Sequence, residues 1–151
     1  MAASITVSSP AFGNGAAIPP RYTCSGTDVS PPLSWSGVPE GTKSLALTVI
    51  DPDAPGKPFV HWLIFNLPSA TTELAEGAAP PSGSVQGRND FGSNGYRGPC
   101  PPPGSPHHYH FKLYALDTTT SLRAGASEPA FENVIKSHVL ASGELIGTFK
   151  R

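Results

Sequence analysis

Four side chains that can exchange protons or bind an anion stand at alternating positions in three apolar segments. They are Asp51 in segment 45–51, His61 in segment 59–67, and His107 with Tyr109 in segment 107–113. Because the side chains of a β-strand alternate between its two faces, each is predicted to point the same way as the apolar residues of its own segment. Burying such groups is costly unless they are paired or reach a pocket. The pattern therefore predicts one small polar site at the mouth of an apolar core, where imidazolium and phenol groups donate hydrogen bonds to an oxyanion.

The role of Asp51 in such a site depends on its neighbours. A carboxylate repels a bare phosphate, but it favours a protonated imidazole nearby and accepts from a monoprotonated phosphate or an ammonium group. Taken alone, Asp51 before Pro52 is also typical of a turn, and either histidine alone is typical of a hydrogen-bonded core residue. Their joint occurrence favours a shared pocket.

Two proline-rich segments, 51–55 and 98–104, adjoin these strands in the sequence. Proline restricts the backbone, so both segments are predicted to be stiff loops that hold a concave rim in one shape. Asp53 is one residue out of phase with the inward row and is expected to brace the first loop at this rim.

Strand alternation also predicts to which face of its strand each neighbouring side chain points. It places Leu63 and Phe65 on the same face as His61, and it turns Trp62 away from the pocket, toward a second layer or a subunit contact. In the third segment it separates His107 from His108 and His110. We therefore expect no metal site in this histidine-rich stretch.

A hydrolase is an alternative for these residues, since aspartate and histidine also occur in acyl-transfer sites. However, the sequence contains no Gly-x-Ser-x-Gly motif, and no serine occupies the inward row beside His61 or His107. We therefore expect a binding protein and not an enzyme. A weak hydrolase that uses an imidazole as general acid or base is the less favoured alternative.

Length and charge restrict the remaining possibilities. The chain has 151 residues, which is about one domain, and we expect residues 1–151 to form it. A formal net charge of −1, with 14% charged residues, argues against a nucleic-acid partner. No apolar stretch is long enough to span a membrane, and the first residues do not resemble a signal peptide. We expect a cytoplasmic protein, or a periplasmic or secreted one if a signal peptide has been removed.

The elements predicted from these patterns are mostly strands, at residues 5–8, 33–35, 44–51, 59–67, 109–116 and 144–149. One helix is predicted over about residues 128–141, with Ser127 as N-cap and Gly143 as its stop. Short strands punctuated by glycine and proline indicate an all-β fold of antiparallel sheets.

Several motifs occur in one order along the chain: Asp51-Pro-Asp-Ala-Pro55, His61-Trp62, Gly98-Pro-Cys-Pro-Pro102 and His107-His-Tyr109. In order and spacing they resemble the signature of the phosphatidylethanolamine-binding protein family, in particular its bacterial and archaeal Raf-kinase-inhibitor-like branch. Two departures are that Phe59 stands where tryptophan is common, and that His108 stands where arginine is usual. The similarity extends from about residue 12 to residue 149.

This resemblance implies two antiparallel sheets with Greek-key topology and an anion pocket for phosphate or a phosphorylated head group, with no cofactor. It also allows a homodimer, or a protein inhibitor of a serine protease or kinase that acts through its surface loops. By position, the pocket residues of the family fall on Asp51, Ala54, Pro55, Phe59, His61, Gly98, Pro101, Pro102, His107 and Tyr109.

The two cysteines, Cys24 and Cys100, form no Cys-x-x-Cys pair. The sequence is equally compatible with a disulfide between them and with two thiols.

Overall fold

The computed structural model describes residues 3–151. In chain order its elements are β1 (Ala3–Ser4), β2 (Thr6–Ser8), the 3₁₀ helix η1 (Pro20–Tyr22), β3 (Leu33–Ser36), β4 (Ser44–Asp51), β5 (Phe59–Pro68), β6 (Glu73–Leu74), β7 (Val85–Gln86), β8 (His107–Leu116), α1 (Glu128–Ile135) and β9 (Val139–Phe149). The predicted all-β fold class is confirmed.

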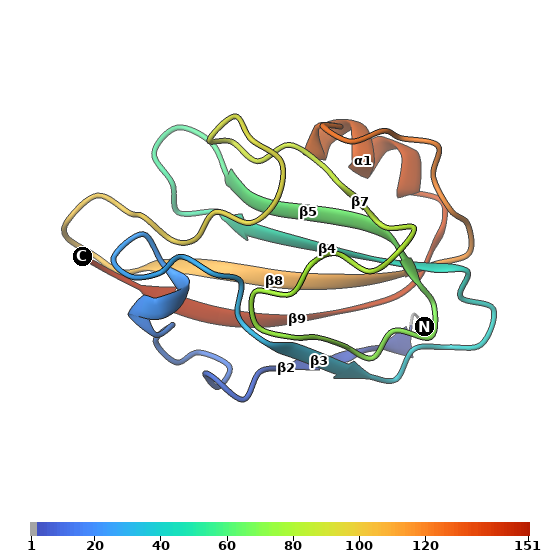
Figure 1. Cartoon of the computed structure of the whole chain (residues 1–151), viewed down its shortest axis with the longest axis horizontal. Coiled ribbons are helices and arrows are strands. Elements are labelled where there is room, and N and C mark those ends of the chain that lie inside the picture. The colour runs from blue at the N-terminus through green and yellow to red at the C-terminus, as the bar shows by residue number, and fades with distance from the viewer. Residues whose placement is uncertain (1–2) are drawn as a thin grey trace.

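The strands form two sheets in separate layers (Figure 1). The larger sheet has six strands in the order β1-β9-β8-β4-β5-β7, and the smaller has three in the order β2-β3-β6. Every pairing between these strands is antiparallel except the short one between β1 and β9. Figure 1 shows α1 on one side of the larger sheet and the strands β2 and β3 on the other.

The main core lies between the two sheets, and β4 and β8 supply its centre. Leu47 pairs with Leu113 and Val49 with Phe111, and all four side chains are fully buried in this layer. Asp51 and Tyr109 continue the same two rows toward the end of the sheet. The alternation predicted for these strands is therefore correct, and it brings polar groups to the place where the core ends.

A second core lies under α1 on the other face of the larger sheet. Phe131 and Ile135 of the helix pack on Leu63 and Phe65 of β5. The N-terminus of α1 is capped as predicted, because Ser127 Oγ accepts from the backbone N–H of Ala130 at 3.2 Å.

The predicted helix over residues 128–141 is wrong beyond Ile135. Val139 pairs with Leu116 and Ala141 with Ala115, so this stretch begins β9 instead. Gly143, expected to stop the helix, lies opposite Leu113 within the strand. A Cβ at this position would overlap the backbone carbonyl of Ile5, so the glycine permits close approach of the N-terminal chain. Tertiary pairing here overrides the local helical pattern.

Glu128, at the start of α1, predicts a pH-dependent stability. Burial, together with the charges of Glu132 and Asp90, raises the pKa of Glu128 to about 7. A raised carboxyl pKa lowers stability as the pH rises from the ordinary glutamate range toward 7. We expect Glu128→Gln to raise the free energy of unfolding at about pH 8 by less than about 1 kcal/mol, because the side chain is partly exposed, and to leave it unchanged at about pH 4. An exposed control, Glu40→Gln, is expected to have no such pH-dependent effect. Equal shifts for Glu128→Gln at both pH values in thermal denaturation would contradict this.

The side chains of β5 do not alternate regularly between the two faces of the sheet. The prediction that Trp62 points to a second layer or a subunit contact is therefore wrong. Val49 of β4 pairs with Trp62, and Ile50 pairs with Val60, so His61 is an extra residue in a β-bulge. As a result Trp62 packs in the main core and Leu63 in the core under α1. A second irregularity lies near Asn66, whose φ is 56°.

The loops beside Asp51 and His107 gather at one end of the sandwich, on the left in Figure 1. A disulfide between Cys24 and Cys100 ties the segment after η1 to the proline-rich loop 98–104. The backbone N–H of Cys24 also donates to the Pro99 carbonyl at 3.1 Å. The structure thus selects the disulfide from the two alternatives that the sequence left open.

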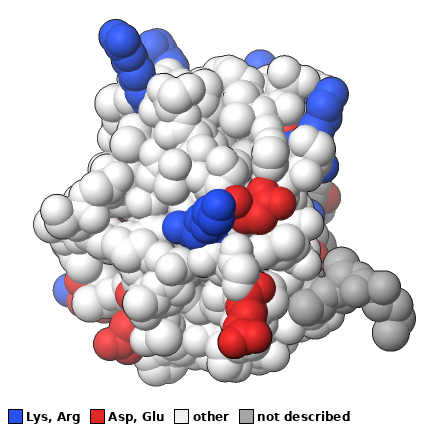
Figure 2. All heavy atoms as spheres, turned by 90° about the vertical axis from the view of Figure 1, so that its right-hand side faces the viewer, with Lys and Arg blue, Asp and Glu red and all other residues white. Residues whose placement is uncertain are grey.

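The opposite end of the molecule carries scattered charges of both signs among uncharged residues (Figure 2). That face therefore shows no concentrated basic patch of the kind that binds nucleic acid. Within residues 3–151, no helix is long and apolar enough to cross a membrane.

Candidate functional site

Asp51, the last residue of β4, has both carboxylate oxygens engaged. Its Oδ1 accepts from the backbone N–H of Asp53 at 2.8 Å, and its Oδ2 lies 2.6 Å from His107 Nδ1. The side chain of Asp51 is only 4% exposed. The turn and pocket roles that the sequence left as alternatives are therefore combined, because one oxygen braces the Asp-Pro loop and the other holds an imidazole.

His107, the first residue of β8, is oriented by this contact. A carboxylate only accepts, so Nδ1 of the imidazole carries a proton and donates to Asp51. The ring nitrogen Nε2 is then the atom left to meet a ligand. It is an acceptor when the ring is neutral and a donor when the ring is protonated.

His61 reaches the same pocket because of the bulge in β5. Its Nδ1 lies 2.7 Å from the backbone carbonyl of Arg97, which fixes the proton on Nδ1 and leaves Nε2 for a ligand. The ring packs edge-on against Tyr109, with centroids 5.3 Å apart. Burial lowers the pKa of His61, although the Arg97 carbonyl and the charge of Asp51 act in the opposite direction. The ring is therefore neutral near pH 7 while the pocket holds no ligand.

The Tyr109 hydroxyl is the polar group of the site that lacks a partner. It is buried, and it makes no hydrogen bond to any residue in the described part of the chain. Burial, followed by the charge of Asp51, raises the pKa of Tyr109, so the phenol keeps its proton. A buried hydroxyl without a partner costs about 1–3 kcal/mol, and its presence beside a cavity points to a ligand or water.

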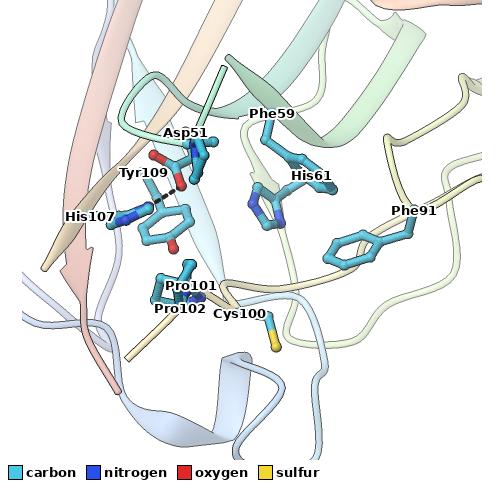
Figure 3. A pocket seen from close by; sticks show the side chains of 11 residues that line it. Asp51, Phe59, His61, Phe91, Cys100, Pro101, Pro102, His107 and Tyr109 are labelled. Carbon is cyan, nitrogen blue, oxygen red and sulfur yellow. Dashed lines mark hydrogen bonds and ion pairs between the residues drawn. The ribbon is translucent and has the colours of Figure 1, made fainter. Parts of the chain in front are cut away.

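These groups line a cavity of about 180 Å³ (Figure 3). Of the residues proposed from the sequence, all but Gly98 line it: Asp51, Ala54, Pro55, Phe59, His61, Pro101, Pro102, His107 and Tyr109. Two further lining residues, Phe91 and Cys100, were not predicted. The cavity is therefore polar around Asp51, His107 and Tyr109 and apolar along most of its remaining wall.

Gly98 lies behind the lining and has a structural role. Its N–H donates to Asp28 Oδ1 at 2.9 Å. A side chain here would overlap the Tyr22 carbonyl and the Asp28 carboxylate, so only glycine fits between the rim loop and the segment after η1.

Phe91 comes from a long loop in which the sequence showed no regular pattern. Its backbone N–H donates to Asn89 Oδ1 at 3.0 Å, and the buried Asn89 also donates to the Gly95 carbonyl at 2.9 Å. One buried side chain therefore gives this loop its shape. An asparagine surrounded by glycines is only a weak signal, which is why sequence reasoning did not place Phe91 at the pocket.

The other histidines pair with carboxylates outside the pocket. His108 lies 2.7 Å from Asp53, His110 lies 3.3 Å from Glu144, and His138 lies 2.8 Å from Asp117. His108 turns away from His107, as alternation predicted, and its bonds to Asp53 lower the pKa of that carboxyl. Among the described residues, no cluster of three or more His, Cys, Asp or Glu side chains could hold a metal ion.

The fold and the site define a two-sheet β domain with a compact, preformed pocket at one end. In sequence, the chain matches the phosphatidylethanolamine-binding protein family over residues 8–150. The chain belongs to this family, as the motifs indicated.

Two relatives show how close the similarity is. A UPF0098 protein of Methanothermobacter thermautotrophicus is 52% identical over 145 residues, which is 93% of this chain and 95% of the relative. A UPF0098 protein of Pyrococcus horikoshii is 50% identical over 156 residues, which is 98% of this chain and 77% of the relative.

Solved structures agree with the fold. The crystal structure of YbcL from Escherichia coli, described as a member of the mammalian PEBP family, superimposes with a TM-score of 0.93 at 38% identity, covering 98% of this chain and 99% of that one. A phosphatidylethanolamine-binding protein homologue from Chlamydia trachomatis gives a TM-score of 0.92 at 40% identity, covering 98% of each chain.

Proposed function

We propose that this protein is a non-enzymatic binding module whose pocket captures a phosphate or the phosphoryl group of a small ligand. The observation that carries the proposal is the unpartnered hydroxyl of Tyr109 beside the imidazoles of His61 and His107, each of which has its Nδ1 occupied. Three groups that can donate to oxyanion oxygens thus line one cavity.

The charges of the site favour a complex in which an imidazole and the phosphoryl group share a proton. Each oxygen of Asp51 already accepts a hydrogen bond, from the Asp53 backbone or from His107, so Asp51 acts on the ligand mainly by orienting the His107 ring. A neutral His61 can accept the proton of a monoprotonated phosphate, and a protonated His61 can donate to a dianion. Both cases place at least one proton between the imidazoles and the phosphoryl oxygens.

The size of the pocket limits the ligand to a head group. A cavity of about 180 Å³ is smaller than the sites that enclose drug-sized molecules. It accommodates a phosphoryl group with a small substituent, and any longer chain would have to lie outside the rim formed by Pro55 and Pro102.

The lining supports binding and not catalysis. It contains no serine or threonine, and the sulfur of Cys100 is held in the disulfide with Cys24. The pocket therefore offers no aliphatic hydroxyl or thiol nucleophile next to an imidazole, and the raised pKa of Tyr109 keeps its phenol protonated.

Phosphate affinity is expected to fall as the pH rises from about 5 to about 8. The pKa of His61 is lowered by burial, and only its protonated ring donates from Nε2, so the donor form present at low pH is lost as the pH rises through that pKa. Calorimetric titration with sulfate, which stays dianionic throughout, separates this effect from the ionisation of phosphate. Equal sulfate affinity at both ends of the range would contradict the role given to His61.

Protease or kinase inhibition and homodimer formation stay predictions from the family resemblance. The exposed loop carrying Pro55, Gly56 and Lys57 is the segment of the rim that such a partner would meet first.

A further inference from the structure

Phe91 adds an aromatic wall on the side of the pocket away from Asp51 and His107 (Figure 3). Its ring centroid lies 4.8 Å from that of Phe59 and 5.6 Å from that of His61. Phe91 is also 42% exposed, and its backbone is held in place by the buried Asn89. An apolar group on the ligand would cover this surface.

A positive charge already lies against the same ring. The guanidinium carbon of Arg97 is 5.0 Å from the centroid of Phe91. Asp28 offsets this charge only in part, because its Oδ2 lies 3.8 Å from Arg97 Nε while its Oδ1 accepts from Gly98. A ligand cation placed on Phe91 would therefore meet a like charge.

The lining also offers no free carboxylate for such a cation. Asp51 is its only acidic residue, and both of its oxygens already accept hydrogen bonds from Asp53 and His107. Apart from His61, His107 and Tyr109, the remaining wall consists of Ala54, Phe59, Phe91, the disulfide-bonded Cys100 and prolines. An ammonium group that lost its water here would have to share the Asp51 carboxylate with the Asp53 backbone and His107, which is costly.

We propose that the ligand of this pocket is a phosphomonoester whose substituent is compact, uncharged and apolar, and that Phe91 and Arg97 together select it over an ammonium head group. This inference rests on the proposed function, since the phosphoryl group is assumed to sit between the two imidazoles. Phe91 packs against the apolar substituent, and Arg97 disfavours a positive one. The pocket thereby discriminates against the phosphoethanolamine head group that the family name suggests.

The experiment compares dissociation constants of inorganic phosphate, phosphoethanolamine and phenyl phosphate, measured by calorimetry at one pH. In the wild type, phenyl phosphate is expected to bind about tenfold more tightly than phosphoethanolamine. In Phe91→Ala this ratio is expected to fall to about two or less, because the aromatic contact is gone. In Arg97→Gln the affinity for phosphoethanolamine relative to inorganic phosphate is expected to rise about two- to fivefold, because the removed charge attracts the phosphoryl group of both ligands and repels only the ammonium group.

A matched control removes a positive charge far from the pocket. Lys43 precedes β4 at the end opposite Asp51, so Lys43→Gln is expected to keep the wild-type ratio. Arg97→Gln keeps the backbone carbonyl that holds His61, so that contact is not disturbed.

The outcomes separate the two claims. If phosphate binds but phosphoethanolamine binds as tightly as phenyl phosphate, the inference is overturned and the proposed function stands. The inference is also overturned if Phe91→Ala still binds phenyl phosphate about tenfold more tightly than phosphoethanolamine. If none of the three compounds binds the wild type, the proposed function fails and the inference fails with it.

Discussion

Replacing Asp51 by alanine is expected to weaken phosphate binding by about 100-fold, because the His107 ring loses the hydrogen bond that orients it toward the ligand. The carboxylate holds the His107 ring at 2.6 Å and fixes the Asp53 backbone at 2.8 Å. Without it the His107 ring loses the hydrogen bond that orients it, and the rim loop loses the one that Asp53 donates. The measurement is calorimetric titration with inorganic phosphate at about pH 6.

Asp117 provides a matched control for this variant. It pairs with His138 at 2.8 Å, so Asp117→Ala also breaks an aspartate–histidine contact, but one that is exposed and lies away from the pocket. Asp117→Ala is expected to keep the wild-type affinity. If Asp51→Ala retains its fold in an amide NMR spectrum and binds phosphate as the wild type does, Asp51 has no role in binding.

Removing the disulfide is expected to have the largest effect on stability. The bond between Cys24 and Cys100 closes a loop with a sequence separation of 76 residues. In the chain-entropy account, a loop of this length contributes about 4 kcal/mol by restricting the unfolded chain. The double variant Cys24→Ser, Cys100→Ser is therefore expected to unfold at a much lower urea concentration than the oxidised wild type.

The reduced wild type is the control for this comparison, because it has the same cysteines without the bond. Its midpoint is expected to match that of the double variant. If reduction leaves the midpoint unchanged, the disulfide does not contribute as its loop length predicts.

How far the sequence predicts this fold depends on whether a strand is regular. In β4 and β8 the side chains alternate without interruption up to the pocket, so Asp51 and Tyr109 could be placed from their spacing alone. In β5 the bulge at His61 shifts the phase, so the same rule puts Trp62 on the wrong face. Single-sequence periodicity carries no signal for an inserted residue.

The end of α1 was missed for a different reason. Val139 has the spacing of a helical core residue, yet β8 offers it a long strand partner and Gly143 permits the close approach of Ile5. Both features belong to segments distant in sequence. The boundary is therefore decided by tertiary contacts that local propensity does not contain.

The polar half of the site was predictable, whereas much of its apolar half was not. Polar groups are rare at the inward positions of a strand. This rarity is what identifies His61, His107 and Tyr109 from the sequence. Phe91 reaches the pocket from a loop whose shape depends on the hydrogen bonds of Asn89. A loop held by one side chain leaves no periodic pattern in the sequence.

The most direct test of the binding site is an NMR titration of the imidazole signals of His61 and His107 with inorganic phosphate at about pH 6. The account predicts saturable shifts of both rings in the wild type, the loss of both in Asp51→Ala, and no shift of His138, which pairs with Asp117 outside the pocket. If both pocket rings stay unmoved at millimolar phosphate while the protein is folded, the convergence of Asp51, His61, His107 and Tyr109 is structural, and the proposed function is wrong.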